Sequence, residues 1–442
     1  MRKFLLYLWI AGIITGCDPG ATTVYYLDSQ NGNDSNPGLT PGLPWKSLSR
    51  TNEIVLKPGD QVLLKAGSRF SGSLTFKNAG GSLKAPVILG VYGKGKAYIQ
   101  SFDSAAVIIE NAFGFVCRNL VVTGSGRLNS NKTDGLFIKG SRNIEIDSVE
   151  ASGYLYSGIH VKGGSHIKIA GVYAHDNGFS GIYAESGEPE YGTDGSKFKT
   201  MHSVEIGNCK AENNPGCPAI TDNHSGSGIL IAGVVNGYIH HCEAMNNGWD
   251  MPREGNGPVG IWAYMCDSVV IENCFSHDNK TSEHGKDGGG FDFDGGIRYS
   301  VMQNNISANN EGAGYGIFQY AGATEWKGNV MRNNTSYNDG VKNSRSGIFM
   351  WCDPVAQPMR DFEAYNNTVV TCFEHAVSFE PGDYEGFIFS KNVFLINGNQ
   401  DGFIFGNFKG ARFSQNIYSA FNMPASVEYD TAAVLIPFKN LR

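Results

Sequence analysis

Charged residues are scarce in this 442-residue chain: Asp, Glu, Lys and Arg make up 17% of it, and the formal net charge is −7. Such a chain offers no basic patch to hold a phosphate backbone, so a nucleic-acid-binding protein is excluded. Proline is also scarce, at 16 residues, whereas the 58 glycines are nearly twice the usual share. This combination is typical of an ordered fold with many tight turns.

Long apolar runs are absent after the first twenty residues. A basic start at Arg2 and Lys3 precedes an apolar run over residues 4–16, a pattern typical of a signal peptide and too short for a permanent membrane span. The run ends in "ITGC", which resembles the lipobox of bacterial lipoproteins and would make Cys17 the lipidated first residue. We therefore expect a lipid-anchored outer-membrane or periplasmic protein of the cell envelope, touching the membrane only through its lipid. An ordinary signal peptide with a chance cysteine is the alternative.

A short unit recurs along the chain: a glycine, an apolar residue, another residue and a second apolar residue. The unit begins at Gly135, Gly158, Gly181, Gly228, Gly260, Gly290, Gly314 and Gly347, with looser copies at Ala376 and Gly402. The closest starts are 23 residues apart, which indicates a solenoid with loops inserted between coils. Apolar residues alternate with period two, so the units are strands, and a second alternating segment follows in each coil. The sequence predicts an all-β parallel β-helix, in which Ile159, Ile182, Ile229, Ile261, Phe291, Tyr315 and Ile348 form one buried stack.

A second register lies just after the second strand of each coil. It holds Cys209, Cys242, Cys274, Asn305, Asn334, Asn367, Asn392 and Asn416. Stacked asparagine amides can hydrogen-bond along the solenoid axis, and small cysteines fit the same position. We therefore expect these three cysteines to be buried free thiols rather than disulfides.

Four segments are expected along the chain. Residues 1–16 form the signal peptide, 17–105 an N-terminal cap with the first strands, 106–420 the β-helix and 421–442 a C-terminal closing segment. Within the cap, residues 45–54 read as a short amphipathic helix, followed by an apolar strand in "QVLLKAG". Both ends need covers, because an open coil exposes unpaired backbone groups.

Several motifs resemble those of one group of proteins. "YYLDSQNGNDSNPG", "LKPGDQVLLKAG", "AHDNGFSGI" and "SHDN" resemble segments of Bacteroidetes-type β-helix lipoproteins of the pectate-lyase superfamily. The resemblance implies a single-stranded, right-handed parallel β-helix, but that superfamily contains lyases, hydrolases and proteins of unknown activity. The tract "KDGGGFDFDGG" is similar to a calcium site of one lyase family. Gly288 and Gly289 stand where two ligand aspartates would be, which departs from that pattern.

Outward positions of the repeated strand carry aromatic and acidic side chains instead of the usual Lys, Thr and Asn. The aromatic residues Trp262, Tyr264, Phe349 and Trp351 can stack on sugar rings, and Tyr183, Glu185 and His160 extend the predicted substrate-binding face. The expected ligand is a polysaccharide or oligosaccharide. The alternative is that loops cover the aromatic residues as a satellite core.

Asp292 and Asp294 alternate with phenylalanines, so both carboxyl groups project from one face of one strand, with β-carbons about 7 Å apart. Two acids this close have pKa values that diverge, which suits one as general acid and the other as base or nucleophile. Gly316, the neighbour of Asp292 in the next coil, is expected to leave room for substrate. Such a hydrolase requires no cofactor. The alternative is a calcium site built from Asp287, Asp292 and Asp294.

Three functions remain open from the sequence. A monomeric hydrolase that uses the aspartate pair is favoured. A lyase, acting by β-elimination on a uronic-acid polymer, would need a base and a cation, for which Lys286 is the best candidate, while His160 and Lys162 lie several coils away. A non-catalytic glycan-binding or structural β-helix would use the same aromatic residues without acid–base chemistry.

Overall fold

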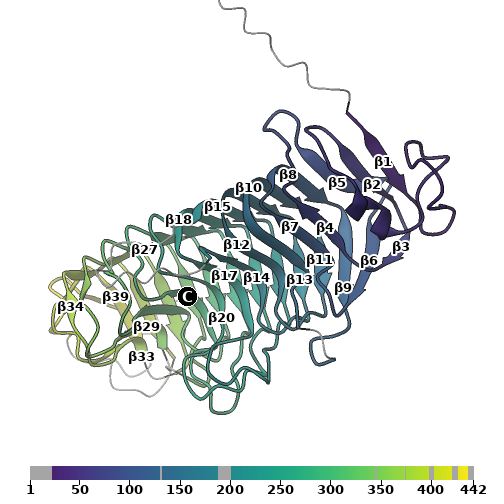
Figure 1. The fold of residues 1–442 in the computed structure, drawn as a ribbon. Helices are drawn as coiled ribbons and strands as arrows, with labels where there is room; N and C mark the ends of the chain where they lie inside the picture. Colours follow the sequence, from purple (N-terminus) through teal and green to yellow (C-terminus); the bar gives the residue numbers. More distant parts are fainter. Residues whose placement is uncertain are drawn as a thin grey trace, which may run out of the picture.

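Almost all regular structure in the chain is β-strand, as the period-two repeats predict (Figure 1). The computed structural model describes residues 22–129, 132–187, 201–343, 346–373, 375–397, 403–420 and 427–436. Successive coils pair in parallel and in register, so the strands build long ladders along an elongated solenoid. The chain is therefore a parallel β-helix, which confirms the predicted fold class.

Each coil contributes strands to three faces. Face 1 consists of β4 (Leu74–Lys77), β7 (Val107–Glu110), the first parts of β10 (Leu136–Asp147) and β12 (Ser157–Ala170), β14 (Ser180–Glu185), β17 (Ser227–Ala232), β20 (Val259–Tyr264), β23 (Gly289–Phe293), β26 (Tyr315–Gln319), β29 (Ser346–Cys352), β33 (His375–Phe379) and β37 (Ile404–Gly406). Face 2 consists of β1 (Val24–Leu27), β2 (Gln61–Lys65), β5 (Val87–Tyr92), β8 (Phe113–Arg118), the second parts of β10 and β12, β15 (Met201–Gly207), β18 (Val234–His240), β21 (Val270–Glu272), β24 (Val301–Gln303), β27 (Val330–Arg332), β31 (Glu363–Tyr365), β35 (Phe387–Ser390) and β38 (Ala411–Ser414). Face 3 consists of β3 (Arg69–Ser71), β6 (Ala97–Phe102), β9 (Leu120–Gly124), β11 (Glu150–Ser152), β13 (Tyr173–His175), β16 (Lys210–Glu212), β19 (Glu243–Met245), β22 (Phe275–His277), β25 (Ile306–Ala308), β28 (Thr335–Tyr337), β32 (Thr368–Thr371), β36 (Val393–Ile396), β39 (Ile417–Ala420) and β40 (Val434–Leu435). A short pair, β30 (Met359–Arg360) and β34 (Tyr384–Glu385), lies outside these ladders.

The interior confirms the predicted buried stack. The pairing register aligns Ile159, Ile182, Ile229, Ile261, Phe291, Tyr315 and Ile348 on consecutive strands of face 1. All are buried, with at most 1% of any of them exposed. Burial of this one column along the axis gives every coil the same apolar contact with its neighbours, which stabilises the solenoid by nearest-neighbour packing.

The asparagine ladder is also present. Asn305, Asn334, Asn367 and Asn392 each donate a side-chain hydrogen bond, 3.0–3.1 Å long, to the carbonyl oxygen of the next asparagine, and Asn416 ends the series on Asp430. The cysteines continue the ladder: the backbone N–H of Cys242 donates to Cys274 Sγ at 3.4 Å. Cys209, Cys242 and Cys274 are free and buried, as predicted.

A second ladder was not predicted. Asn177, Asn214, Asn247, Asn279 and Asn310 bond in series at the opposite end of the face 3 strands and end on Asp339. Many ladder residues follow an asparagine with positive φ, such as Asn304 at 56° and Asn333 at 57°. Asparagine tolerates this left-handed conformation better than most residues, which explains the Asn-Asn pairs at the turns.

The ends of the solenoid differ from expectation. The predicted cap and the predicted β-helix share one ladder, because β1, β2, β5, β8 and β10 pair in series, so residue 105 marks no structural boundary. The predicted helix over residues 45–54 is a shorter 3-10 helix, Leu48–Glu53, and the apolar strand after it is β2. At the other end, β40 pairs with β39 and adds a last strand to face 3.

Cys17 and the signal segment lie outside the described residues. Nowhere in the described chain does a helix have both the length and the apolar character needed to cross a membrane.

Candidate active site

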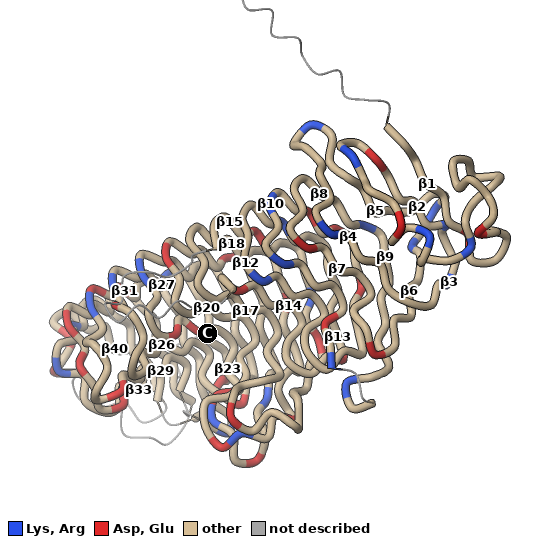
Figure 2. Tube along the Cα trace, viewed as in Figure 1, with Lys and Arg blue, Asp and Glu red and all other residues tan. Residues whose placement is uncertain are grey.

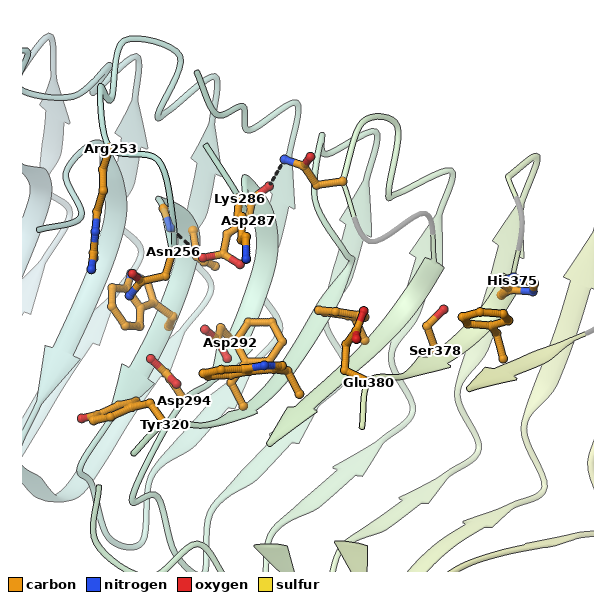
Figure 3. Close-up of a pocket in the computed structure, with 18 residues that line it drawn as sticks. Arg253, Asn256, Lys286, Asp287, Asp292, Asp294, Tyr320, His375, Ser378 and Glu380 are labelled. Atoms are coloured by element: carbon orange, nitrogen blue, oxygen red, sulfur yellow. Dashed lines mark hydrogen bonds between the residues drawn. The ribbon is translucent and has the colours of Figure 1, made fainter. Parts of the chain in front are cut away.

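A cavity of about 830 Å³ lies on the outer side of face 1, beside β20 to β37 (Figure 3). Its lining consists of Arg253, Asn256, Gly257, Val259, Trp262, Lys286, Asp287, Asp292, Asp294, Phe318, Tyr320, Asn343, Phe349, Trp351, His375, Ser378, Glu380 and Phe405. The predicted pair, Asp292 and Asp294, is therefore in the cavity. Its walls combine aromatic rings with carboxyl, basic and amide groups, which suits a sugar ligand.

Asp292 projects into the cavity because β23 alternates inward and outward residues. Phe291 and Phe293 point into the core, with 1% and 0% exposed, whereas Asp292 pairs laterally with Trp262 and Gly316. The predicted free space above Gly316 is absent. A β-carbon there would come 2.7 Å from the Phe318 ring and 3.2 Å from Asp292 Oδ1, so these two side chains fill the position.

Burial dominates the electrostatics of the aspartates. Burial raises the pKa of Asp292 well above its usual range, and the nearby Asp294 and Asp287 raise it further. Asp292 is 3% exposed, and its Oδ1 has no hydrogen-bond partner among the described residues. Burial also raises the pKa of Asp294 to about 7, although the N–H of Gly295 donates to its carboxylate at 2.7 Å. Burial and the two neighbouring carboxyl groups thus favour the protonated form of Asp292, while Asp294 titrates near neutral pH.

Asp287 is a third carboxyl group in the cavity, from the loop just before β23. Its Oδ2 accepts a 2.7 Å hydrogen bond from the N–H of Gly257, which joins two loops beside the cavity. Burial raises its pKa to about 6, although that hydrogen bond and the charges of Lys286 and Arg253 act in the opposite direction.

The calcium hypothesis finds no support in this geometry. Within the described part of the chain, no three His, Cys, Asp or Glu side chains lie close enough together to hold a metal ion. Asp287, Asp292 and Asp294 share one cavity without forming a ligand cluster.

Of the four predicted aromatic residues, Trp262, Phe349 and Trp351 line the cavity. Phe318 packs edge-on against Phe349 and Trp351, with ring centroids 5.7 Å and 6.5 Å apart. Phe318 follows the same outward register, since it pairs with Trp351 on the next coil. Phe318, Tyr320, His375 and Phe405 were missing from the predicted binding residues. Tyr320 lies beyond the end of its strand, and no repeat unit marks it.

Trp262 and Tyr264 do not form an open platform, so the satellite-core alternative is correct for them. Trp262 is 4% exposed; its Nε1 donates to Ser227 Oγ at 3.1 Å, and the His224 ring packs edge-on at 4.9 Å. Together with Tyr183, Leu230, Ala232 and Val259 it forms a small apolar cluster separate from the core. The loop that carries His224 lies over the strand, so Trp262 walls one end of the cavity.

His160, Tyr183 and Glu185 lie outside the cavity, contrary to the prediction. His160 sits between Asp134 and Glu185, with both nitrogen-to-oxygen distances 3.1 Å. Burial lowers the pKa of His160, but the hydrogen bonds and charges of these two carboxylates outweigh it and raise the pKa to about 9. The hydroxyl of Tyr183 donates to Glu185, which also contacts Lys162. These residues form a half-buried ionic network about four coils from Asp292. Their contacts with one another account for the polar and charged side chains at these positions without a bound substrate.

The chain has a right-handed parallel β-helix fold. A family model described as "Right handed beta helix region" matches residues 191–354. The structure of a GH136 lacto-N-biosidase from Eubacterium ramulus is similar, with a TM-score of 0.60 at 18% identity over 94% of this chain and 68% of that chain. The catalytic domain of a GH87 alpha-1,3-glucanase in complex with nigerose has a TM-score of 0.51 at 10% identity, over 81% and 65% of the two chains.

One sequence relative is more similar over a shorter stretch. Lacto-N-biosidase of Bifidobacterium longum subsp. longum is 40% identical over 93 residues. That segment is 20% of this chain and 6% of the relative, so the chain matches only a small part of that enzyme. The likeness to the solved structures, at these low identities, establishes the fold.

Proposed function

We propose that this chain is a glycoside hydrolase that cleaves an oligosaccharide or polysaccharide in the face 1 cavity. The observation that carries the proposal is one cavity with three carboxyl groups whose pKa values are raised by burial, beside the aromatic rings of Phe349 and Trp351. Aromatic faces bind sugar rings, and carboxyl groups with separated pKa values divide the acid and base roles. The glycosidase names of several similar proteins support this class.

Asp292 and Asp294 are our first assignment for the catalytic pair. Asp292, protonated at neutral pH, would donate its proton to the glycosidic oxygen as the bond to the sugar carbon breaks. Asp294, ionised, would attack that carbon or deprotonate the attacking water. Hydrolysis adds one water across the bond, and the proton lost by Asp292 is regained in the cycle.

A second assignment pairs Asp294 with Asp287. Both are more exposed than Asp292, and both pKa values lie near neutrality, at about 7 and about 6. In that case Asp292 would be a neutral neighbour of both carboxyl groups. Asp294 is common to both assignments.

Variants at the three positions test the proposal. We expect Asp294→Asn to lower turnover about 100-fold or more, which is the usual contribution of an acid or base. If Asp292 is the catalytic partner of Asp294, Asp292→Asn should cause a similar loss of turnover. If Asp287 is the partner, Asp287→Asn should cause it instead. The control is Asp339→Asn, which changes a buried carboxyl of raised pKa outside the cavity and should keep full activity.

Release of reducing ends is measured on a panel of neutral and uronic polysaccharides. Full activity in all three cavity variants would exclude this centre, and Glu380, which also lines the cavity, would be examined next.

A polysaccharide lyase is the second candidate, favoured by one observation: Lys286 and Arg253 line the same cavity next to Asp287. A cation there could neutralise a uronic carboxylate while Lys286 removes the proton beside it. The same panel, read by the ultraviolet absorbance of an unsaturated product, distinguishes the two reactions. Binding without either product would indicate a non-catalytic glycan-binding protein.

A further inference from the structure

Phe405 lies on the same outward column as Asp292, four strands further along face 1. The register runs from Asp292 to Gly316, Phe349, Ser378 and Phe405 on consecutive coils. At about 4.8 Å per strand, Phe405 is roughly 19 Å from Asp292 along the axis. Figure 3 shows His375, beside Phe405, at the far end of the row of lining residues that runs from the aspartates past Glu380 and Ser378.

The exposed ring of Phe405 is held in a defined orientation. It is 57% exposed, and it stacks on His375 with ring centroids 4.6 Å apart and planes 11° from parallel. Single exposed apolar side chains are common and need no explanation. This one, however, lines the same cavity as the carboxyl groups and lies in the same outward column as Phe349.

Polar groups accompany the stacked rings. Ser378 and Glu380 line the cavity between Phe349 and Phe405, and no hydrogen bond or ion pair of their side-chain oxygens is found among the described residues. An aromatic face beside a free hydroxyl and a carboxylate suits a sugar ring, whose CH face is apolar and whose edge carries hydroxyl donors. The negative charge of Glu380 favours a neutral sugar over a uronic acid.

We propose that Phe405, His375, Ser378 and Glu380 form a distal subsite for a neutral sugar ring of an extended oligosaccharide. The subsite rests on the proposed function, because the proposed function places the other end of the oligosaccharide at the carboxyl groups. The lining residues extend only one coil from Asp292 in one direction, to Trp262, and four coils in the other, to Phe405, so an extended substrate runs from Asp292 toward Phe405. A disaccharide at the aspartates does not reach Phe405, whereas a hexasaccharide does.

The test compares ligands of two lengths. Binding of nigerose, nigerohexaose, lacto-N-biose and para-lacto-N-hexaose is measured by isothermal titration calorimetry in the Asp294→Asn background, so that ligands are not consumed. We expect at least one hexasaccharide to bind more tightly than its disaccharide. Phe405→Ala should weaken the hexasaccharide about tenfold and leave the disaccharide unchanged, as expected for one lost aromatic contact. Phe405→Tyr, which keeps the ring, should retain the preference.

Phe275→Ala is the matched control. Phe275 is 38% exposed and stacks on His277 at 4.0 Å, but it lies on face 3, away from the cavity. It should leave binding of both lengths unchanged. Binding of no ligand, equal affinity for both lengths, or a length preference that survives Phe405→Ala would overturn the subsite. Product release by the unmodified protein is assayed separately: length-dependent binding without any product keeps the subsite and rejects the hydrolase.

Discussion

Asp292 carries a buried carboxyl group whose Oδ1 has no hydrogen-bond partner in the described part of the chain, an arrangement that costs stability. Its pKa is raised, first by burial and then by Asp294 and Asp287. Between the pKa of the unfolded chain, about 4, and the raised value, the folded state holds a proton that the unfolded state has lost. Stability therefore falls as pH rises above about 4, and the loss continues through neutrality.

Asp292→Asn should relieve this loss. The observed burial predicts a melting temperature for this variant that is higher than that of the unmodified protein by about 2 °C or more at pH 8, with little difference near pH 4. Differential scanning fluorimetry across this pH range measures the effect. Asp222→Asn, at an exposed site, serves as the control and should show the wild-type profile. An unchanged pH dependence in Asp292→Asn would show that this carboxyl is not protonated in the folded state.

At the scale of the element, the ladder residues connect each coil to the next. Asn305 Oδ1 accepts a 3.0 Å hydrogen bond from the backbone N–H of Cys274. The side-chain amide of Asn305 donates one hydrogen bond to the carbonyl oxygen of Ile271 at 2.9 Å and another to Asn334 Oδ1. Cysteine performs part of this role one coil earlier, since Cys274 Sγ accepts from Cys242 and contacts the carbonyl of Glu272. The junction between the cysteine and asparagine segments therefore allows a direct comparison.

Asn305→Ala should destabilise the protein more than Asn305→Cys. Alanine leaves the buried N–H of Cys274 and the carbonyl of Ile271 without partners, which costs about 2 kcal/mol or more, whereas a thiol retains the acceptor for Cys274. Urea unfolding under reducing conditions measures the difference. Equal midpoints for the two variants would mean that the ladder hydrogen bonds contribute little beyond packing.

At the scale of the whole molecule, the cavity occupies one part of one face of the solenoid. Residues of both charges are scattered along the tube (Figure 2), and the cavity with its carboxyl groups lies on the outer side of face 1. The chain enters the described structure at β1, at the end of the solenoid remote from the cavity (Figure 1). An anchor before β1 would therefore leave the cavity accessible.

We propose that Cys17 carries that anchor. Cys17→Ser removes the thiol to which lipid is added, and stable membrane attachment depends on the acyl chains. The variant should appear in the soluble fraction after cell fractionation, while the unmodified protein sediments with the membranes. Recovery of the unmodified protein as soluble material would reject the lipobox interpretation.

The sequence by itself determined the fold, the buried stack, the first ladder and the outward direction of Asp292, Asp294, Phe349 and Trp351. These depend on period two within a strand and on pairing with the next copy, both of which repeat along the chain. Only the tertiary structure decided which outward residues meet a cavity. Trp262 is covered, and Asp287 is brought into the cavity of Asp292 and Asp294, because loops between coils fold over face 1. Their paths depend on contacts between segments distant in sequence, such as Asp287 with Gly257, which no periodic pattern records.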